Sequence, residues 1–432
     1  MLWKYDFILP QWLVDRHGLS SNKVSFSHIR ALHNFQKNRE YKIAPNIKPA
    51  VFDQGPWAKM RVAPAKAALS RATAAGLRFL VKEYQYPEKF LTTALFMEYY
   101  GKFYDLFSSR TRVLCFSGNN EVKLDENYAF AFEFIKIINE MTFDVKHGRQ
   151  QKPIQVGLSL TVSSMLSIVD FFVRHLKFPF LLPGRFSTDV VENTNSQIRR
   201  RYKEPKVIEL KRAVKCLIVL VHMRQSDLGS YDNDDDAVWL TQLKDIKKLQ
   251  QKEDDPEAVK DYEAIQYTDE QLTDFSEKNC VMYVSGYTLK HTICTKPSKC
   301  RSCQEILTQS SASLPEHVLI LEKEFKEGAL VFPSELAFKF FLYCESNFQK
   351  NRHLFRSKEV YLKVVADVTS TGIESFEMTS CCTRLIVARW FKIRMGFWSR
   401  VVDAKFKETI QHQKLQRSAA HSSKSMAAPK AS

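Results

Sequence analysis

The chain has 432 residues, of which 44% are hydrophobic, 26% charged and 12% aromatic, with only 13 glycines and 15 prolines. This composition supplies enough apolar material for more than one packed core and excludes a mostly disordered or collagen-like chain. A formal net charge of +16 and a pI near 9.3 indicate a polyanionic partner, such as a nucleic acid or an anionic membrane.

The apolar runs and the cysteines indicate in which cellular compartment the protein is expected. The longest apolar run, Ala213 to Met223, is interrupted by Lys215 and is much shorter than the ~20 residues that a membrane span requires. The first residues lack the basic and apolar regions of a signal peptide. Nine cysteines, an odd number, do not suggest a full disulfide framework. We therefore expect a reducing compartment, no membrane partner and a location in the nucleus.

Apolar residues recur at helical spacing along most of the chain, which predicts a mainly α-helical protein. Helices are predicted at residues 60–80, 91–107, 129–141, 162–176 and 385–402. The last of these carries a predicted basic face made of Arg389, Lys392, Arg394 and Arg400. Short strands are predicted at residues 41–44, 113–116 and 281–284.

An acidic stretch divides the chain. Between Asp232 and Gln271 there are 13 acidic and 5 basic residues, a net charge of −8 within a chain that is otherwise strongly basic. Few large apolar residues occur there, which predicts a solvated linker between two packed regions. The Ser-, Ala- and Lys-rich residues 417–432 are predicted to be disordered.

The sequence contains no GxxxxGK[ST], GxGxxG, GxSxG or HExxH motif, so the common nucleotide, hydrolase and zinc-protease functions lack support. In the segment 182–201, Asp189 is placed to cap a new helix, with Glu192 as its capping-box partner. The alternative is that Glu192 binds a metal ion beside a basic strip that meets a phosphate backbone. That strip consists of Arg199, Arg200 and Arg201.

A second group of residues has the chemistry of a zinc site. His291, Cys294, Cys300 and Cys303 lie within 13 residues and form a valid tetrahedral ligand set. Four protein ligands leave no open position, so the pattern predicts a structural ion. The alternative is a set of free, reduced cysteines, which are common in nuclear proteins.

A third segment, residues 59–70, is rich in alanine and predicts a closely packed core helix. Together these segments resemble P-element-type transposases, a family that includes the THAP-type transposases of animals. Residues 59–70 are similar to a segment of the family's GTP-binding insertion domain. The pattern DxxEN…SxIR matches Asp189 to Arg199, and YVxGY followed by CxxC matches Tyr283 to Cys303. A basic, aromatic segment at 389–394 completes a resemblance that spans roughly residues 1 to 400.

The resemblance implies DNA cut-and-paste transposition by an RNase-H-like domain. Two aspartates and one glutamate of that domain hold divalent metal ions such as Mg²⁺, which activate the attacking oxygen and stabilise the leaving one. Glu192 matches the catalytic glutamate of the family. The two aspartates lie upstream of the insertion domain in the family, and neither Asp6 nor Asp15 has their sequence context.

The resemblance also implies a GTP site. Arg61, Val62 and Ser70 match positions near the nucleotide, and Asp105 matches the residue that accepts the two N–H donors of guanine. Arg61 stands where the family has a lysine, and Ser108 stands where the family tends to have an asparagine.

Five parts are therefore predicted. They are a GTP-binding insertion domain at 1–183, the end of an RNase-H-like domain at 184–228, an acidic linker at 229–275, a helical C-terminal domain with a metal knuckle at 276–416, and a disordered tail at 417–432. Without its upstream strands, the RNase-H-like part is expected to expose apolar surface around Val207 to Val221, which a second copy of the chain or another partner would cover.

Two functions follow from these expectations. The first is a truncated transposase that is inactive alone. The alternative is a domesticated, non-catalytic nuclear protein that binds DNA, nucleotide or protein. Since the family's zinc finger is missing from this sequence, DNA binding is expected to be electrostatic and tolerant of sequence.

Overall fold

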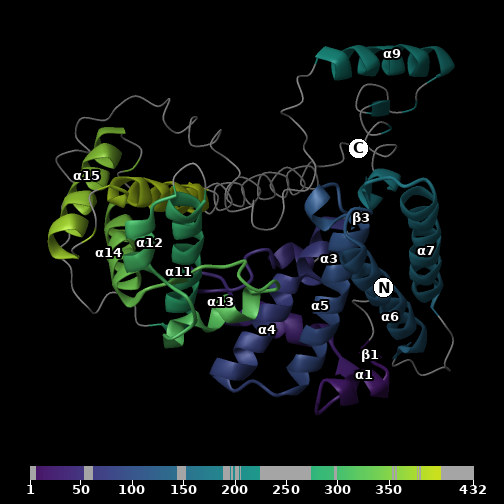
Figure 1. Ribbon diagram of the computed structural model, residues 1–432, viewed down its shortest axis with the longest axis horizontal. Coiled ribbons are helices and arrows are strands. Elements are labelled where there is room, and N and C mark those ends of the chain that lie inside the picture. Colours follow the sequence, from purple (N-terminus) through teal and green to yellow (C-terminus); the bar gives the residue numbers. More distant parts are fainter. Residues whose placement is uncertain are drawn as a thin grey trace, which may run out of the picture. The chain divides into compact units, whose positions relative to one another are not determined.

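The computed structural model describes residues 6–52, 62–143, 152–187, 206–223, 274–295, 299–352, 358–376 and 381–399, together with Asn195, Ile198, Arg199, Glu204, Phe355 and Met378. The chain forms two compact units, Met1–Tyr231 and Asp232–Ser432. The division lies within the stretch predicted as an acidic linker, most of which is outside the described residues. The fold is mainly α-helical, as predicted, and each described strand is only two residues long (Figure 1).

In the first unit, the elements follow one another in chain order. They are β1 (Phe7–Ile8), α1 (Gln11–Arg16), β2 (Lys23–Val24), α2 (Phe26–Gln36), η1 (Pro49–Val51), α3 (Val62–Ala68), α4 (Arg71–Tyr84), α5 (Lys89–Phe107), η3 (Arg112–Leu114), β3 (Phe116–Ser117), α6 (Glu121–Glu140), β4 (Thr142–Phe143), α7 (Pro153–Val169), the π-helical turn η4 (Asp170–His175), β5 (Phe180–Leu181), η5 (Pro183–Phe186) and α9 (Val207–Met223). Strand β1 pairs antiparallel with both β2 and β4, with Phe7 opposite Val24 and Phe143. Strand β3 pairs antiparallel with β5.

The helix predicted at 60–80 is two helices, α3 and α4, because the chain turns at Ser70. This residue has extended backbone angles, φ −106° and ψ 157°, and its hydroxyl accepts a hydrogen bond from the backbone N–H of Thr73 at 3.2 Å. Such an N-cap satisfies one of the N–H groups that a helix start leaves without an intrahelical partner. Ser70 therefore ends one helix and begins the next, a local signal that helical periodicity alone does not reveal.

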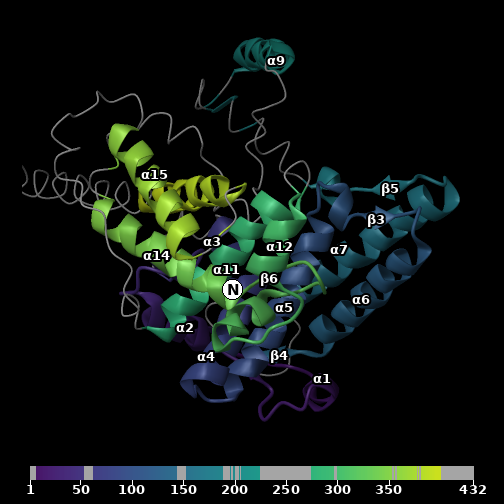
Figure 2. The same cartoon turned by 60° about the vertical axis from the view of Figure 1, so that its left-hand side comes forward.

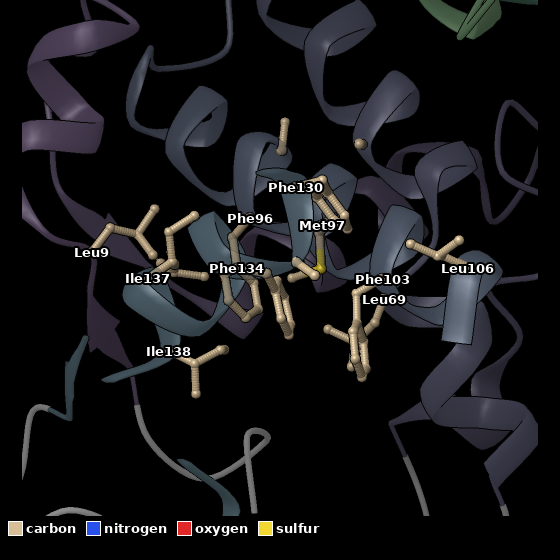
Figure 3. Packing of buried hydrophobic residues seen from close by; sticks show 14 of the residues in the cluster. Leu9, Leu69, Phe96, Met97, Phe103, Leu106, Phe130, Phe134, Ile137 and Ile138 are labelled. Atoms are coloured by element: carbon tan, nitrogen blue, oxygen red, sulfur yellow. The ribbon is translucent and has the colours of Figure 1, made fainter. Parts of the chain in front are cut away.

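The core of the first unit contains the facing sides of α5 and α6 (Figure 3). Phe103 on α5 stacks against Phe134 on α6, with ring centroids 4.4 Å apart and an angle of 7° between the ring planes. Phe96 and Met97 from α5 lie in the same cluster as Ile137 from α6. Burial of one such side chain contributes about 2 kcal/mol, so this packing holds α5 in a fixed position.

Helix α7 and its π-helical turn form the segment Pro153–His175, which is long and apolar enough to cross a membrane by length and composition alone. In this unit α7 lies beside α6 (Figures 1 and 2), and its buried side chains include Val162, Leu166 and Val169. Val156 and Leu160 are well exposed, so one side of the helix packs in the core and the exposed side carries these two apolar residues.

Helix α9 also has apolar side chains on its surface. Val207, Ile208 and Ile218 are each more than half exposed, and Val214 is exposed as well. The prediction of exposed apolar surface in this region is confirmed for the side chains that the structure describes.

In the second unit, the elements are α11 (Phe275–Leu289), the π-helical turn η8 (Lys290–Cys294), α12 (Arg301–Leu307), β6 (Thr308–Gln309), η9 (Pro315–His317), α13 (Val318–Lys323), β7 (Phe332–Pro333), α14 (Glu335–Asn351), α15 (Lys358–Ser375) and a last helix at 383–399. Helices α11 and α12 both pack against α14 (Figure 2). The last helix contributes Trp390, whose ring lies 4.8 Å from that of Phe341 on α14.

Gly286 of the YVxGY segment lies inside α11 at a close contact with another part of this unit. A Cβ atom at this position would lie 2.3 Å from the carbonyl oxygen of Val331. The glycine is therefore required by the approach of the chain just before β7, not by its own backbone angles.

The predicted strands are mostly wrong. Residues 41–44 form no strand, and residues 281–284 lie inside α11. Helix α11 is buried on most of its sides, which removes the polar face from which helical periodicity is recognised. In the third segment, Val113 and Leu114 belong to η3, and the strand begins at Phe116.

The predicted basic face of the last helix needs one correction. Lys392 is exposed as expected, but Arg394 is only 2% exposed and faces the core of the second unit. Arg400 lies outside the described residues. Arg394 is thus a structural residue and is not part of a DNA-facing surface.

Candidate functional site

The residues predicted to lie near GTP belong to three helices of the first unit. Val62 begins α3 and is 63% exposed, while Arg61 lies outside the described residues. Ser70 is the N-cap of α4. Asp105 lies in the last turn of α5.

The start of α4 contacts α5 at Gly101. A Cβ atom on this glycine would lie 2.7 Å from Cγ of Arg71 and 3.0 Å from the backbone nitrogen of Arg71. One helical turn further along α5, Oδ2 of Asp105 lies 3.8 Å from a guanidinium nitrogen of Arg71. Arg71, which follows Ser70 in the chain, therefore connects the start of α4 to Asp105.

The carboxylate of Asp105 is suited to guanine. Its side chain is 38% exposed, and a carboxylate accepts up to about four hydrogen bonds. This capacity is compatible both with the ion pair to Arg71 and with the two N–H donors of the guanine edge. Burial lowers the pKa of the Arg71 guanidinium, and the negative charge of Asp105 opposes this change.

Ser70 has a different role in this structure. Its side chain is only 6% exposed, and its hydroxyl donates to the carbonyl oxygen of Ala67 at 3.0 Å while accepting from Thr73. These bonds fix the turn between α3 and α4. Ser70 therefore positions the N-terminus of α4, and its predicted place near a nucleotide stays a prediction.

A lysine on α3 contacts the tyrosine that precedes Asp105 on α5. Nζ of Lys66 on α3 lies 4.9 Å from the ring centroid of Tyr104, the neighbour of Asp105. A cation over a tyrosine ring gains electrostatic stabilisation. Lys66 thus adds positive charge beside Tyr104, the residue that precedes Asp105 in α5.

The end of α5 also holds the segment that leads toward Glu192. The backbone N–H of Gly184 donates to the carbonyl oxygen of Ser109 at 2.9 Å. A Cβ atom on Gly184 would lie 2.4 Å from the carbonyl oxygen of Ser108, so a larger residue would push this segment away. The Pro-Gly pair therefore anchors residues 183–186 against the helix that carries Asp105.

The predicted catalytic and DNA-contacting residues are only partly described. Glu192, Arg200 and Arg201 lie outside the described residues. Arg199 is described, and its side chain is exposed. The predicted roles of these residues stay predictions.

The four predicted zinc ligands fall into two groups in the second unit. Cys300 and Cys303 form a cluster of four thiols with Cys381 and Cys382, and all four sulfur atoms lie within 4.8 Å of one another. Burial raises the pKa of the Cys382 thiol, and hydrogen bonds among the neighbouring thiols raise it further.

The other two predicted ligands lie elsewhere. The ring of His291 packs against Tyr287, with centroids 4.4 Å apart, and Cys294 lies in the π-helical turn η8. Neither is part of the thiol cluster. The sequence signal for the cluster was the adjacent pair Cys381-Cys382, but this pair lies 78 residues after Cys303, beyond the reach of a local spacing rule.

Comparison with known proteins finds one family that matches part of the first unit. Residues 14–116 match the family described as "TNP-like, GTP-binding insertion domain", and this range contains Val62, Ser70 and Asp105. A sequence search of curated proteins finds no match. The solved Drosophila P element transposase strand transfer complex is similar at 18% identity with a TM-score of 0.41, over 50% of this chain and 50% of that one. This chain thus covers about half the length of that transposase chain. Residues 14–116 therefore match a TNP-like, GTP-binding insertion domain, which confirms for this segment the family resemblance predicted from the sequence.

Proposed function

We propose that this chain functions in DNA transposition of the P-element type and that its insertion domain binds a guanine nucleotide. The main support is the family match at residues 14–116, combined with the exposed carboxylate of Asp105 beside the start of α4. Asp105 accepts the N–H donors of guanine while its ion pair with Arg71 holds the carboxylate in place, and Lys66 supplies positive charge for the phosphates. GTP is the nucleotide that the family resemblance implies, and it supplies a triphosphate for Lys66 to bind.

DNA is the proposed macromolecular partner. The chain carries a net charge of +16, and the acidic stretch between Asp232 and Gln271 makes the remainder still more basic. Exposed Arg199 belongs to the strip predicted to meet the phosphate backbone. Binding through such charges releases counterions, so the affinity for DNA is expected to fall steeply with salt and to depend little on sequence.

A base-specific substitution tests the nucleotide site. Asp105→Asn replaces one acceptor by an N–H donor, which suits the C2 carbonyl of xanthine and not the amino group of guanine. We expect the variant to bind GTP at least about tenfold more weakly, equivalent to about 1.4 kcal/mol, and to gain affinity for XTP. Displacement of a fluorescent GTP analogue measures both affinities.

The matched control is Asp125→Asn on α6. Asp125 also pairs with an arginine, since its Oδ1 lies 3.1 Å from Arg174, but it is well exposed and belongs to another helix. This variant should bind GTP like the unmodified protein. If the unmodified chain does not bind GTP at millimolar concentration, or if Asp105→Asn changes neither affinity, the nucleotide proposal is wrong.

The second candidate function is a nuclear protein that binds DNA, nucleotide or protein without cutting DNA. The exposed apolar side chains of α9 favour this alternative, because such surface is normally covered by a partner or by a second copy of the chain. The two functions differ in one assay. Mg²⁺-dependent strand cleavage that is lost in Glu192→Gln supports the transposase, whereas DNA binding without cleavage supports the second function.

A further inference from the structure

Four cysteines from two distant segments meet in the second unit. Cys300 directly precedes α12 and Cys303 lies in its first turn, whereas Cys381 and Cys382 directly precede the last helix at 383–399. Sγ of Cys381 lies 3.3 Å from Sγ of Cys303 and 3.7 Å from Sγ of Cys300. The fold therefore brings two pairs of cysteines, which lie far apart in the sequence, together as four soft ligands at one point.

The sulfur positions fit a tetrahedral zinc ion. With Zn–S bonds of about 2.3 Å, the sulfurs of a four-cysteine site lie about 3.8 Å apart. All four sulfurs here lie within 4.8 Å of one another, so small side-chain adjustments suffice to surround one ion. Thiolates select zinc or iron over Mg²⁺ and Ca²⁺, which prefer oxygen ligands.

We propose that Cys300, Cys303, Cys381 and Cys382 bind one structural zinc ion. Four protein ligands close the coordination sphere and leave no position for water or substrate, so the ion has no catalytic role. Binding converts four thiols to thiolates and releases their protons to solvent. The net charge of −2 on the centre is offset by the basic residues next to the ligands in the sequence, Lys299, Arg301 and Arg384.

The position of the ion gives it a definite structural effect. It would tie the start of α12 to the start of the last helix, and so close a loop between Cys303 and Cys381, which are 78 positions apart in the sequence. The last helix contributes Trp390 and Phe391 to the core, both fully buried. Because metal binding energy becomes folding energy when the site exists only in the folded chain, removal of zinc should destabilise the second unit.

Burial distinguishes the four ligands. Cys303 is fully buried, whereas Cys381 is exposed. A serine at position 381 therefore removes one ligand with the least disturbance of packing. Cys294 provides the matched control, because it is half-buried in the same unit, was part of the ligand set predicted from sequence, and lies outside the cluster.

The experiment compares the zinc content of the full chain and of two variants. Each protein is purified from zinc-supplemented cells under reducing conditions and analysed by inductively coupled plasma mass spectrometry. We expect one zinc per chain in the unmodified protein and in Cys294→Ser, and a loss of most of the zinc in Cys381→Ser. Stoichiometric iron, the absence of stoichiometric zinc, or loss of zinc in Cys294→Ser with retention in Cys381→Ser would overturn the proposal.

A second measurement uses the unmodified protein, so its result does not depend on whether the variants fold. Co²⁺ exchanged into the unmodified protein should give intense charge-transfer absorption and the d–d bands of four thiolates. The pattern of three thiolates and one imidazole would instead indicate that His291 is a ligand. Mass spectrometry after purification under the same conditions should find no disulfide between Cys303 and Cys381, and finding one in most molecules would contradict zinc binding.

Discussion

Arg394 and Glu345 form an ion pair inside the second unit, where both side chains are only 2% exposed. Nε of Arg394 donates to Oε2 of Glu345 at 2.7 Å, and a terminal guanidinium nitrogen donates to Oε1 at 2.9 Å. The guanidinium also lies 4.9 Å from the ring centroid of Phe348. The pair joins the last helix to α14, so a residue that the sequence places on a basic surface is instead fixed in the core.

Glu345→Gln should strongly destabilise the second unit. The substitution removes the only negative charge of the pair and leaves the Arg394 cation buried, which typically costs about 3–5 kcal/mol. Urea denaturation followed by tryptophan fluorescence measures the loss, since Trp390 lies in the same core. The control is Glu335→Gln on the same helix, whose partner Lys339 is half exposed, and a change below about 1 kcal/mol is expected there. Equal effects of the two variants would contradict a special role for the buried pair.

Gly286→Ala should also destabilise the second unit, although alanine favours helices. The new Cβ would lie 2.3 Å from the carbonyl oxygen of Val331, and relief of such overpacking typically costs about 1–3 kcal/mol. Gly157→Ala on α7 is the matched control, because no atom outside the helix lies within 4 Å of a Cβ there. That variant should gain about 0.5–1 kcal/mol from helix propensity. Thermal unfolding of the two variants should therefore shift in opposite directions.

His28 should make the first unit less stable in mild acid. Its Nδ1 lies 2.7 Å from the hydroxyl of Thr93 and its ring stacks on Phe90. Burial, aided by the nearby charge of Lys89, lowers the pKa of His28 to about 4. Below pH 6.5 the unfolded chain therefore takes up a proton that the folded chain does not.

The free energy of unfolding should fall as the pH decreases from 6.5 to about 4, with a contribution from His28 approaching about 1.4 kcal/mol per pH unit. Below pH 4 the folded chain is protonated as well, and this contribution stops growing. Urea denaturation of His28→Gln and of the unmodified protein at several pH values isolates the contribution. The stability difference between the two proteins should be constant above pH 7, and a difference that stays constant down to pH 4 would disprove the effect.

Gly101→Ala should weaken guanine-nucleotide binding. A Cβ on Gly101 meets the backbone of Arg71, so the start of α4 must move away from α5 and from Asp105. Gly76→Ala on α4 is the control, since the nearest atoms to its Cβ are side-chain atoms, the end of Leu32 at 2.9 Å and Cγ2 of Ile43 at 3.4 Å, and not backbone. We expect a loss of affinity for a fluorescent GTP analogue in Gly101→Ala alone, at a temperature where both variants are folded. The same affinity in both variants would show that the contact between α4 and α5 does not position the site.

From the sequence alone, the helical class and the resemblance to the transposase family could be predicted, and candidate residues for a nucleotide site could be named. Helix α5 was predicted because apolar residues recur at its inner face, and Asp105 was found because the family motif carries it. These features are local: spacing within one helix or one motif contains the whole signal. The start of α4 was missed only because the cap at Ser70 interrupts an otherwise continuous pattern.

Contacts between residues far apart in the chain could be found only from the folded structure. The sequence pattern predicts Arg394 to be a surface charge, but in the structure it pairs with Glu345 of α14 in the core. Cys300 and Cys303 find their partners in Cys381 and Cys382, not in the nearer Cys294, because the start of the last helix lies against the start of α12. The sequence gives the chemical type of each side chain, but its burial and its partners depend on how elements far apart in the chain pack together.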